Sequence, residues 1–197
     1  MPAMRTRTVA SAELFTAVAA IITTPDLPAL GPSARPNVKS LRELRGQLDS
    51  LFDKVSVPQS TQALIHAAAL FWHDYLDEAH TIVQDAPSPE AAFIHGMMHR
   101  REPDYGNAKY WFNRVGAHVT FSRISMRVHE FLPPKQNSLA SQLVRGGQWQ
   151  PMTFIDACES VAKKPADDPN VALLQEVQKI EFDTLLEHLC TVPAGQK

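Results

Sequence analysis

Apolar side chains recur at intervals of three and four residues along most of the chain, which is the spacing that places them on one face of an α-helix. The clearest example covers residues 41–52 and contains the stripe Leu41, Leu44, Leu48, Leu51 and Phe52. Ser40 precedes this stripe in the position of a helix N-cap. A similar stripe over residues 171–189 predicts a long helix near the end of the chain. The pattern therefore predicts an all-α fold.

Two segments are less regular. The string VTFSRISMRV at residues 119–128 alternates like a strand, but Phe121, Ile124 and Val128 also fit a helix, and the helical surroundings favour the helix. The string VRGGQW is predicted to be a turn in which Gly146 and Gly147 end a helix.

Residues 24–40 contain four prolines and one glycine, so neither a helix nor a central strand can pass through them. We predict an irregular arm that packs weakly or wraps the surface. An amphipathic helix over about residues 11–22 precedes it, with Leu14, Val18 and Ile21 on one face. The predicted organisation is an N-terminal helix with its arm over residues 1–39, followed by a single all-helical domain over residues 40–197.

An internal repeat lies within this domain. Aligning residues 63–86 with residues 92–117 matches identical residues at a constant offset of 29 positions: Ala63 and Ala92, Ile65 and Ile94, His66 and His95, and Ala79 and Ala108. Each unit has an apolar helix, a polar break and a second helix. We therefore predict two tandem αα-hairpins at about residues 61–117, flanked by capping helices, because one hairpin cannot bury its apolar face alone.

The second hairpin resembles a known repeat family. The string DYGNAKYWF has the spacing of the Sel-like subclass of tetratricopeptide repeats on Asp104, Tyr105, Ala108, Trp111 and Phe112. The string YLDEAHTIV resembles the more general tetratricopeptide turn, with Ala79 at the hairpin contact. The resemblance covers about residues 61–117. It implies a concave surface, built by the first helices of the hairpins, that binds a protein, a peptide or a small ligand.

The chain departs from that family at two points. HRREPD replaces a longer glycine-rich loop, and His95 and His99 occupy positions that are usually leucine-like and aromatic. The longer string from WHDYLDEAH to HRREPDYGNAKYWF also resembles a group of microbial proteins of unknown function, which implies no activity. These resemblances therefore bear on the fold and not on a reaction.

Histidines are the main chemical candidates. His95 and His99 lie one turn apart on one helix face, and His66 and His73 lie two turns apart on the equivalent helix of the first hairpin. If stacked hairpins bring these four side chains together, they could bind zinc, iron or manganese. Further oxygen or nitrogen ligands could come from the residues at the same hairpin-turn level, which are Asp74, Asp77, His80, Glu102 and Asp104. The alternative is that they are core histidines hydrogen-bonded to the backbone or to carboxylates. The spacing HxxxH lacks the glutamate of a zinc protease motif, so it assigns no reaction.

The break within the second hairpin is strongly charged. Arg100 and Arg101 could clamp a carboxylate or a phosphate. Alternatively, they could close the loop through salt bridges with Glu102 and Asp104, which is the interpretation we favour. The alignment places the turns of both hairpins at one level. We therefore predict one ligand-binding or polar network made of His73, Asp74, His95, His99, Arg100, Arg101, Glu102, Asp104, Tyr105 and Asn107.

The composition limits the classes of partner that we expect the protein to bind. The 197 residues carry a net charge of -2 and have a pI near 6.4, so we expect neither nucleic acid nor an anionic membrane to bind. The two cysteines, Cys158 and Cys190, are too few for a disulfide framework and favour a reducing, cytoplasmic location. The basic start and the first apolar run resemble a signal peptide, but Glu13 and Thr16 interrupt that run.

The sequence supports two functional interpretations. The first is a soluble helical-repeat protein that binds a protein, peptide or small ligand in a groove lined by the first helices of the hairpins. The second is a metal-binding protein or metal-dependent enzyme that uses the His/Asp/Glu cluster at the hairpin turns. The sequence contains no nucleophile elbow, phosphate-binding loop or dinucleotide motif. Catalysis therefore stays undecided, and a divalent metal is the one cofactor considered.

Overall fold

A computed structural model describes residues 11–132 and 138–191. The basic start of the chain, which contributed to the signal-peptide comparison, lies outside these residues. The described part contains α1 (Ser11–Ile22), α2 (Leu41–Phe52), α3 (Gln59–Trp72), α4 (Leu76–Val83), α5 (Pro89–Arg101), α6 (Tyr105–Val115), α7 (Phe121–Phe131), α8 (Ser138–Leu143), β1 (Val144–Arg145), β2 (Gln148–Trp149), α9 (Pro151–Val161) and α10 (Pro169–Thr191). The predicted all-α fold is confirmed for these residues, and the ambiguous segment before residue 131 is helix α7, as favoured.

The exception to the helical pattern is a small hairpin. Gly146 and Gly147 both have left-handed backbone angles, with φ of 59° and 73°, as the two central residues of a tight hairpin turn require. The turn predicted from VRGGQW is therefore confirmed. The residues beside it were expected to belong to a helix end, but they pair as the antiparallel strands β1 and β2.

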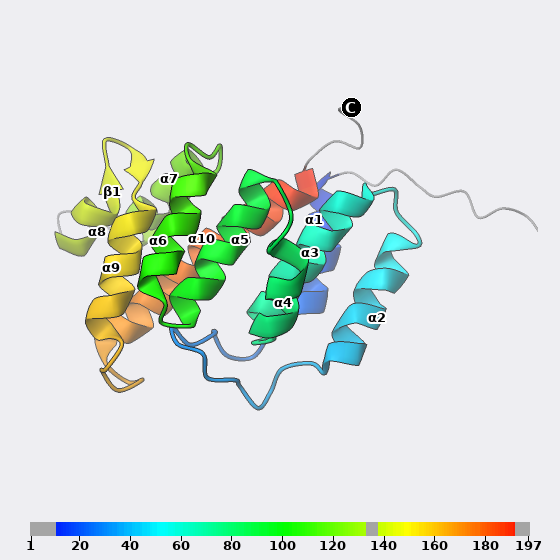
Figure 1. The fold of residues 1–197 in the computed structure, drawn as a ribbon, viewed down its shortest axis with the longest axis horizontal. Helices are drawn as coiled ribbons and strands as arrows, with labels where there is room; N and C mark the ends of the chain where they lie inside the picture. Colours follow the sequence, from blue (N-terminus) through cyan, green and yellow to red (C-terminus); the bar gives the residue numbers. More distant parts are fainter. Residues whose placement is uncertain (1–10, 133–137, 192–197) are drawn as a thin grey trace, which may run out of the picture.

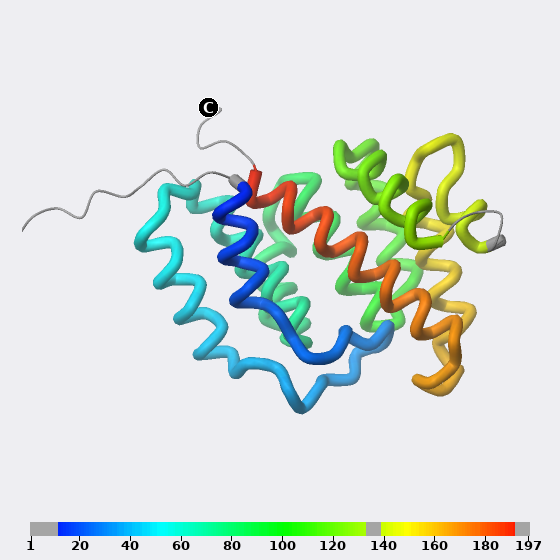
Figure 2. The backbone as a smooth tube through the Cα atoms, turned by 180° about the vertical axis from the view of Figure 1, so that it is seen from behind, coloured from blue at the N-terminus to red at the C-terminus, as the bar shows by residue number. Residues whose placement is uncertain are grey.

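Helices α3, α5, α6 and α9 stand side by side, and α10 crosses behind them (Figure 1). Seen from behind, α10 lies in front of this layer with α1 next to it (Figure 2). Helix α10 packs against α1, α3, α7 and α9, and its apolar face, which includes Leu174, Val177, Phe182 and Leu185, is buried. This long helix therefore closes the core along most of the molecule. Within residues 11–132 and 138–191, no helix is both long and apolar enough to cross a lipid bilayer.

The proline-rich arm follows α1. As predicted, residues 23–40 contain neither helix nor strand. The arm crosses the face of the molecule that Figure 2 presents, and Leu30 is buried in the core. Gln175 and Gln178 of α10 donate hydrogen bonds to the carbonyl oxygen of Pro28, at 3.1 and 3.2 Å. The arm therefore wraps the surface and is held there by buried contacts, so weak packing is not what the structure shows.

Helices α5 and α6 approach each other closely at Gly96. A Cβ atom added to Gly96 would lie 2.7 Å from Cδ2 of the buried Phe112 ring on α6. We expect Gly96→Ala to destabilise the fold by about 1–3 kcal/mol, because the ring cannot move without disturbing the core. Urea unfolding followed by circular dichroism measures the change.

The matched control is Gly46→Ala in the middle of α2. Gly46 is exposed, and an added Cβ meets nothing within 4 Å. Alanine at this position is expected to stabilise the fold by about 0.5–1 kcal/mol through helix propensity. Equal effects of the two substitutions would show that the contact with Phe112 does not restrict residue 96.

Candidate functional site

Three histidines meet where α4 packs against α5. His95 and His99 lie one turn apart on α5, and His80 approaches them from α4. One ring nitrogen from each lies within 4.8 Å of the others. The His95 ring stacks on that of His99 with centroids 4.7 Å apart, and the His80 ring meets that of His95 edge-on at 4.7 Å. We call His80, His95 and His99 the three-histidine centre.

His95 is the most confined member of this centre. Its side chain is buried, at 2% exposure, and its ring stacks on Trp111 of α6 with centroids 3.8 Å apart. Neither of its ring nitrogens has a hydrogen-bond partner among the described residues. Burial, together with the neighbouring His99 and His80, lowers the pKa of His95 to about 3. The ring is therefore neutral at physiological pH, and one of its nitrogens lies within 4.8 Å of a nitrogen of each of the other two imidazoles.

Polar neighbours orient His99. Its Nδ1 atom lies 2.9 Å from a carboxylate oxygen of Glu102, and its Nε2 atom lies 3.1 Å from the side-chain amide of Asn107. Asn107 is itself placed by the start of α6, where its backbone N–H donates to Asp104 at 3.2 Å. Glu102, Asp104 and Asn107 thus form one group with His99, as expected from the sequence.

The structure places His66 and His73 elsewhere. His66 lies 3.0 Å from Asp49 of α2 and packs edge-on against Phe52. His73 is buried, and the part of the chain that the structure describes offers neither of its nitrogens a hydrogen-bond partner. Burial, with the charges of Arg35 and Lys39, lowers the pKa of His73 to about 4. Neither residue joins the three-histidine centre, because α3 turns His66 towards α2 while α4 supplies His80.

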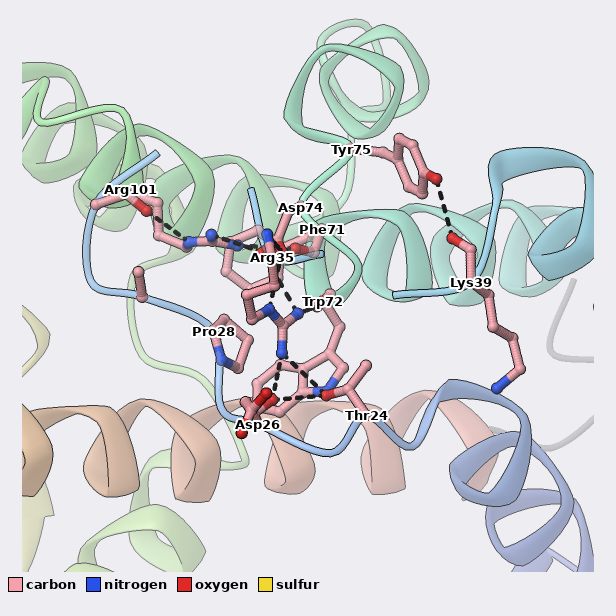
Figure 3. Close-up of polar contacts among 12 residues, drawn as sticks. Thr24, Asp26, Pro28, Arg35, Lys39, Phe71, Trp72, Asp74, Tyr75 and Arg101 are labelled. Carbon is pink, nitrogen blue, oxygen red and sulfur yellow. Dashed lines mark hydrogen bonds and ion pairs between the residues drawn. The ribbon is translucent and has the colours of Figure 1, made fainter. Parts of the chain in front are cut away.

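Arg101 points away from the histidines. Its guanidinium donates to Asp74 Oδ1 at 2.8 Å, to the Phe71 carbonyl at 3.0 Å and to the Gly31 carbonyl at 3.3 Å. Arg35 of the arm donates to the other oxygen of Asp74 through its backbone N–H and its Nε, at 2.9 and 2.8 Å (Figure 3). Arg35 also contacts the carbonyl oxygens of Asp26 and Trp72. Arg35, Asp74 and Arg101 are called the arginine hub.

Asp74 is the common acceptor of the hub. Its side chain is 1% exposed, and its backbone is left-handed, with φ of 68°. Burial alone would raise the pKa of Asp74, but hydrogen bonds from Arg35 and the charge of Arg101 outweigh it and lower the pKa. The carboxylate is therefore charged and paired on both sides. Because Arg101 is fully buried and each of its guanidinium nitrogens already donates a hydrogen bond, the hub fastens the arm and does not offer a clamp for a ligand.

Arg100 faces the opposite side of α5. It donates to Glu181 of α10 at 2.6 Å, its guanidinium lies 4.3 Å from the centre of the Phe154 ring, and Trp149 Nε1 donates to the same carboxylate at 3.2 Å. Arg100 and Glu181 are both fully buried, at 0% exposure. The salt bridges that we favoured between the arginine pair and Glu102 or Asp104 are therefore not formed. Each arginine instead pairs with a carboxylate from a distant segment.

The predicted single network is thus divided into separate groups. His99, Glu102, Asp104 and Asn107 lie with the three-histidine centre, whereas Asp74 and Arg101 belong to the hub. Tyr105 is partly buried, and burial raises its pKa. Tyr105 lines a pocket of about 260 Å³ beside the arm and α9. His80 is one of the further ligands considered from the sequence, whereas sequence reasoning missed Arg35 and Glu181, because no local pattern distinguishes a single polar residue whose partner is distant in the chain.

Comparison with known proteins adds no assignment. No family model, curated protein or solved structure matches the chain. The functional argument therefore rests on the geometry of the residues themselves.

Proposed function

We propose that this chain is a helical metal-binding protein and that the three-histidine centre holds one divalent transition metal. The observation that carries the proposal is the buried His95 ring, which is neutral, lacks a protein partner for either nitrogen among the described residues and faces two further imidazoles. A buried polar atom left without a partner costs about 1–3 kcal/mol. A metal ion at this point would use one of these nitrogens.

The ligand set indicates the class of metal. Imidazole nitrogens suit zinc, iron, copper and nickel, so zinc or iron fits better than manganese among the metals considered from the sequence. Three histidines leave one coordination position for water or a ligand. Nitrogens about 2.0–2.1 Å from a tetrahedral ion are about 3.3 Å apart, so the rings, whose nitrogens lie within 4.8 Å of one another, would have to rotate towards the ion. The metal would replace one of the two contacts of the His99 ring, with Glu102 at Nδ1 or with Asn107 at Nε2, and the remaining contact would orient the ligand.

The scaffold we propose is a pair of tandem hairpins of the Sel-like or tetratricopeptide type, α3 with α4 and α5 with α6. Equivalent backbone bonds end the first helices: Tyr75 N–H donates to the Leu70 carbonyl at 2.9 Å, and Asp104 N–H donates to the His99 carbonyl at 3.0 Å. These bonds are offset by the same 29 positions as the sequence repeat. Ala79 and Ala108 are both fully buried, which also supports equivalent packing.

A second candidate function is the binding of a small, largely apolar ligand in a groove that includes the first helices. A pocket of about 330 Å³ supports it. The pocket is lined by Ser60, Thr61, Ala63 and Leu64 of α3, Ile82 of α4, Ala86, Pro87 and Ser88 of the following loop, Glu90 of α5, and Leu189 of α10. If the purified protein contains no metal and binds none, this second function becomes the better explanation.

Metal analysis of protein produced without a histidine tag tests the first proposal. We expect the chain to bind zinc at the three-histidine centre, and His95→Ala to weaken this binding by at least roughly 100-fold, because losing a ligand should exceed the effect of losing an outer partner. Elemental analysis gives the stoichiometry, and competition with a chelating dye gives the Kd.

The matched control is His66→Ala, which removes a histidine of α3 that pairs with Asp49 outside the centre. This variant should retain the zinc affinity of the unsubstituted protein. If both variants lose one equivalent of zinc, or if neither does, the metal is not bound at the three-histidine centre.

A further inference from the structure

A second cluster of potential metal ligands lies at the opposite end of α5. Glu90 is in the first turn of α5, His118 is in the loop before α7, and His188 is near the end of α10. Glu90 Oε1 lies 3.2 Å from His188 Nε2 and 3.8 Å from His118 Nε2. One ligand atom from each residue lies within 4.8 Å of the others. Three separate segments therefore converge on this point.

His118 is held with one nitrogen free. Its side chain is buried, at 4% exposure, and its ring packs edge-on against Phe93 with centroids 5.4 Å apart. Its Nδ1 atom lies 2.7 Å from the hydroxyl of the buried Thr120. Its Nε2 atom is buried without a hydrogen-bond partner in residues 11–132 and 138–191. Thr120 holds the ring at Nδ1, and if Nδ1–H donates to the Thr120 hydroxyl, the lone pair on Nε2 is available to a metal.

The ligand types of the cluster suit a divalent cation. One carboxylate and two imidazoles converge, and His188 Nε2 lies 3.2 Å from Glu90 Oε1. Glu90 and His188 keep 23% and 20% of their side-chain surface exposed, which leaves a path from solvent. Glu90 also lines the pocket of about 330 Å³ between α3, α4 and α5. An ion here would be reachable by a small molecule.

We propose that Glu90, His118 and His188 form a second, independent binding site for a divalent first-row metal. Two histidines and one carboxylate are the ligand set of mononuclear iron(II) sites and leave several coordination positions open. The carboxylate distinguishes this site from the three-histidine centre, because it adds a negative charge and an oxygen ligand that manganese and iron accept. This site does not depend on the function proposed above, since the two clusters share no residue.

The test uses cobalt(II) as the probe, in protein that carries His95→Ala so that the three-histidine centre is removed. We expect this protein to bind one equivalent of cobalt, with visible absorption bands shifted from those of the aqueous ion. Adding Glu90→Gln, which keeps the size of the side chain and removes its charge, should weaken cobalt binding by at least roughly 10–100-fold. His188→Gln should have a similar effect. Circular dichroism confirms that each variant is folded.

Glu187→Gln in the same background is the matched control, because Glu187 is a neighbouring carboxylate of α10 that pairs with Arg123 and Arg127 outside the cluster. It should leave cobalt binding unchanged. Absence of cobalt binding in the His95→Ala protein would overturn the proposal, and so would equal affinities of the Glu90→Gln and Glu187→Gln proteins. Because the first centre is absent throughout, neither result depends on whether that centre binds metal.

Discussion

Replacing Glu181 with leucine is expected to destabilise the fold by about 3–5 kcal/mol, because it leaves the buried guanidinium of Arg100 without its counter-charge. Both side chains are fully buried and 2.6 Å apart. Trp149 Nε1 would lose its acceptor as well. A loss of this size is a large share of the 5–15 kcal/mol that stabilises a typical domain. Urea unfolding, or the yield of soluble protein if the variant does not fold, measures it.

The double variant Arg100→Met with Glu181→Leu distinguishes the loss of the ion pair from the burial of one unpaired charge. Replacing both charges with apolar side chains of similar volume is expected to recover most of the loss, since neither charge is then buried alone. Asp156→Asn, which breaks an exposed pair with Lys109, should change stability by no more than about 1 kcal/mol. A single Glu181→Leu variant as stable as the Asp156→Asn variant would show that Arg100 is not held by this contact.

Replacing Asp74 with alanine is expected to cost about 3–5 kcal/mol, because both arginines of the hub lose their common acceptor. The buried Arg101 depends on this carboxylate most, since its remaining contacts are to backbone carbonyls. We also expect the arm to loosen, because Arg35 joins it to Asp74 through three hydrogen bonds. Unfolding experiments measure the first effect, and hydrogen exchange of residues 24–40 measures the second.

Asp74→Gly is the informative comparison. Alanine at a left-handed position costs of the order of 1 kcal/mol in backbone strain, whereas glycine adopts this conformation freely. The difference in unfolding free energy between the two variants therefore measures the backbone strain. The stability that the glycine variant still lacks, compared with the unsubstituted protein, measures the contribution of the carboxylate. If Asp74→Gly is as stable as the unsubstituted protein and the arm stays protected, the hub does not hold the arm.

Much of the fold could be predicted because its signals are local. The apolar stripe that begins at Leu41 predicts a helix, and the prolines between residues 24 and 40 predict an irregular segment. Each pattern determines the conformation of the residues that contain it, and the structure agrees with both predictions. The string VRGGQW shows the limit of such signals. Its two glycines indicate the turn, but the pairing of β1 with β2 involves only two residues in each strand, too few to produce a recognisable alternation.

The candidate sites were less predictable because their members come from distant segments. His95 and His99 could be recognised from their spacing on one helix. His80 could be named only as one of several possible further ligands at the hairpin turns, because the repeat alignment places it opposite Lys109 and not opposite another histidine. Glu90 and His188 are 98 positions apart in the chain, and the sequence around either residue does not predict their contact. Such pairs follow from tertiary packing, which also decides that Arg100 and Arg101 take different partners.

The arm and α1 both contact α10, so an early segment of the chain can pack fully only after a late segment has been synthesised. The carbonyl oxygen of Pro28 accepts its hydrogen bond from Gln178, which is 150 positions later in the chain, and α1 packs directly on α10. At about 5–20 residues per second, the first helix is synthesised roughly 8–30 s before the surface that covers it. During that interval the side of α1 that packs on α10 in the folded protein has no partner from α10.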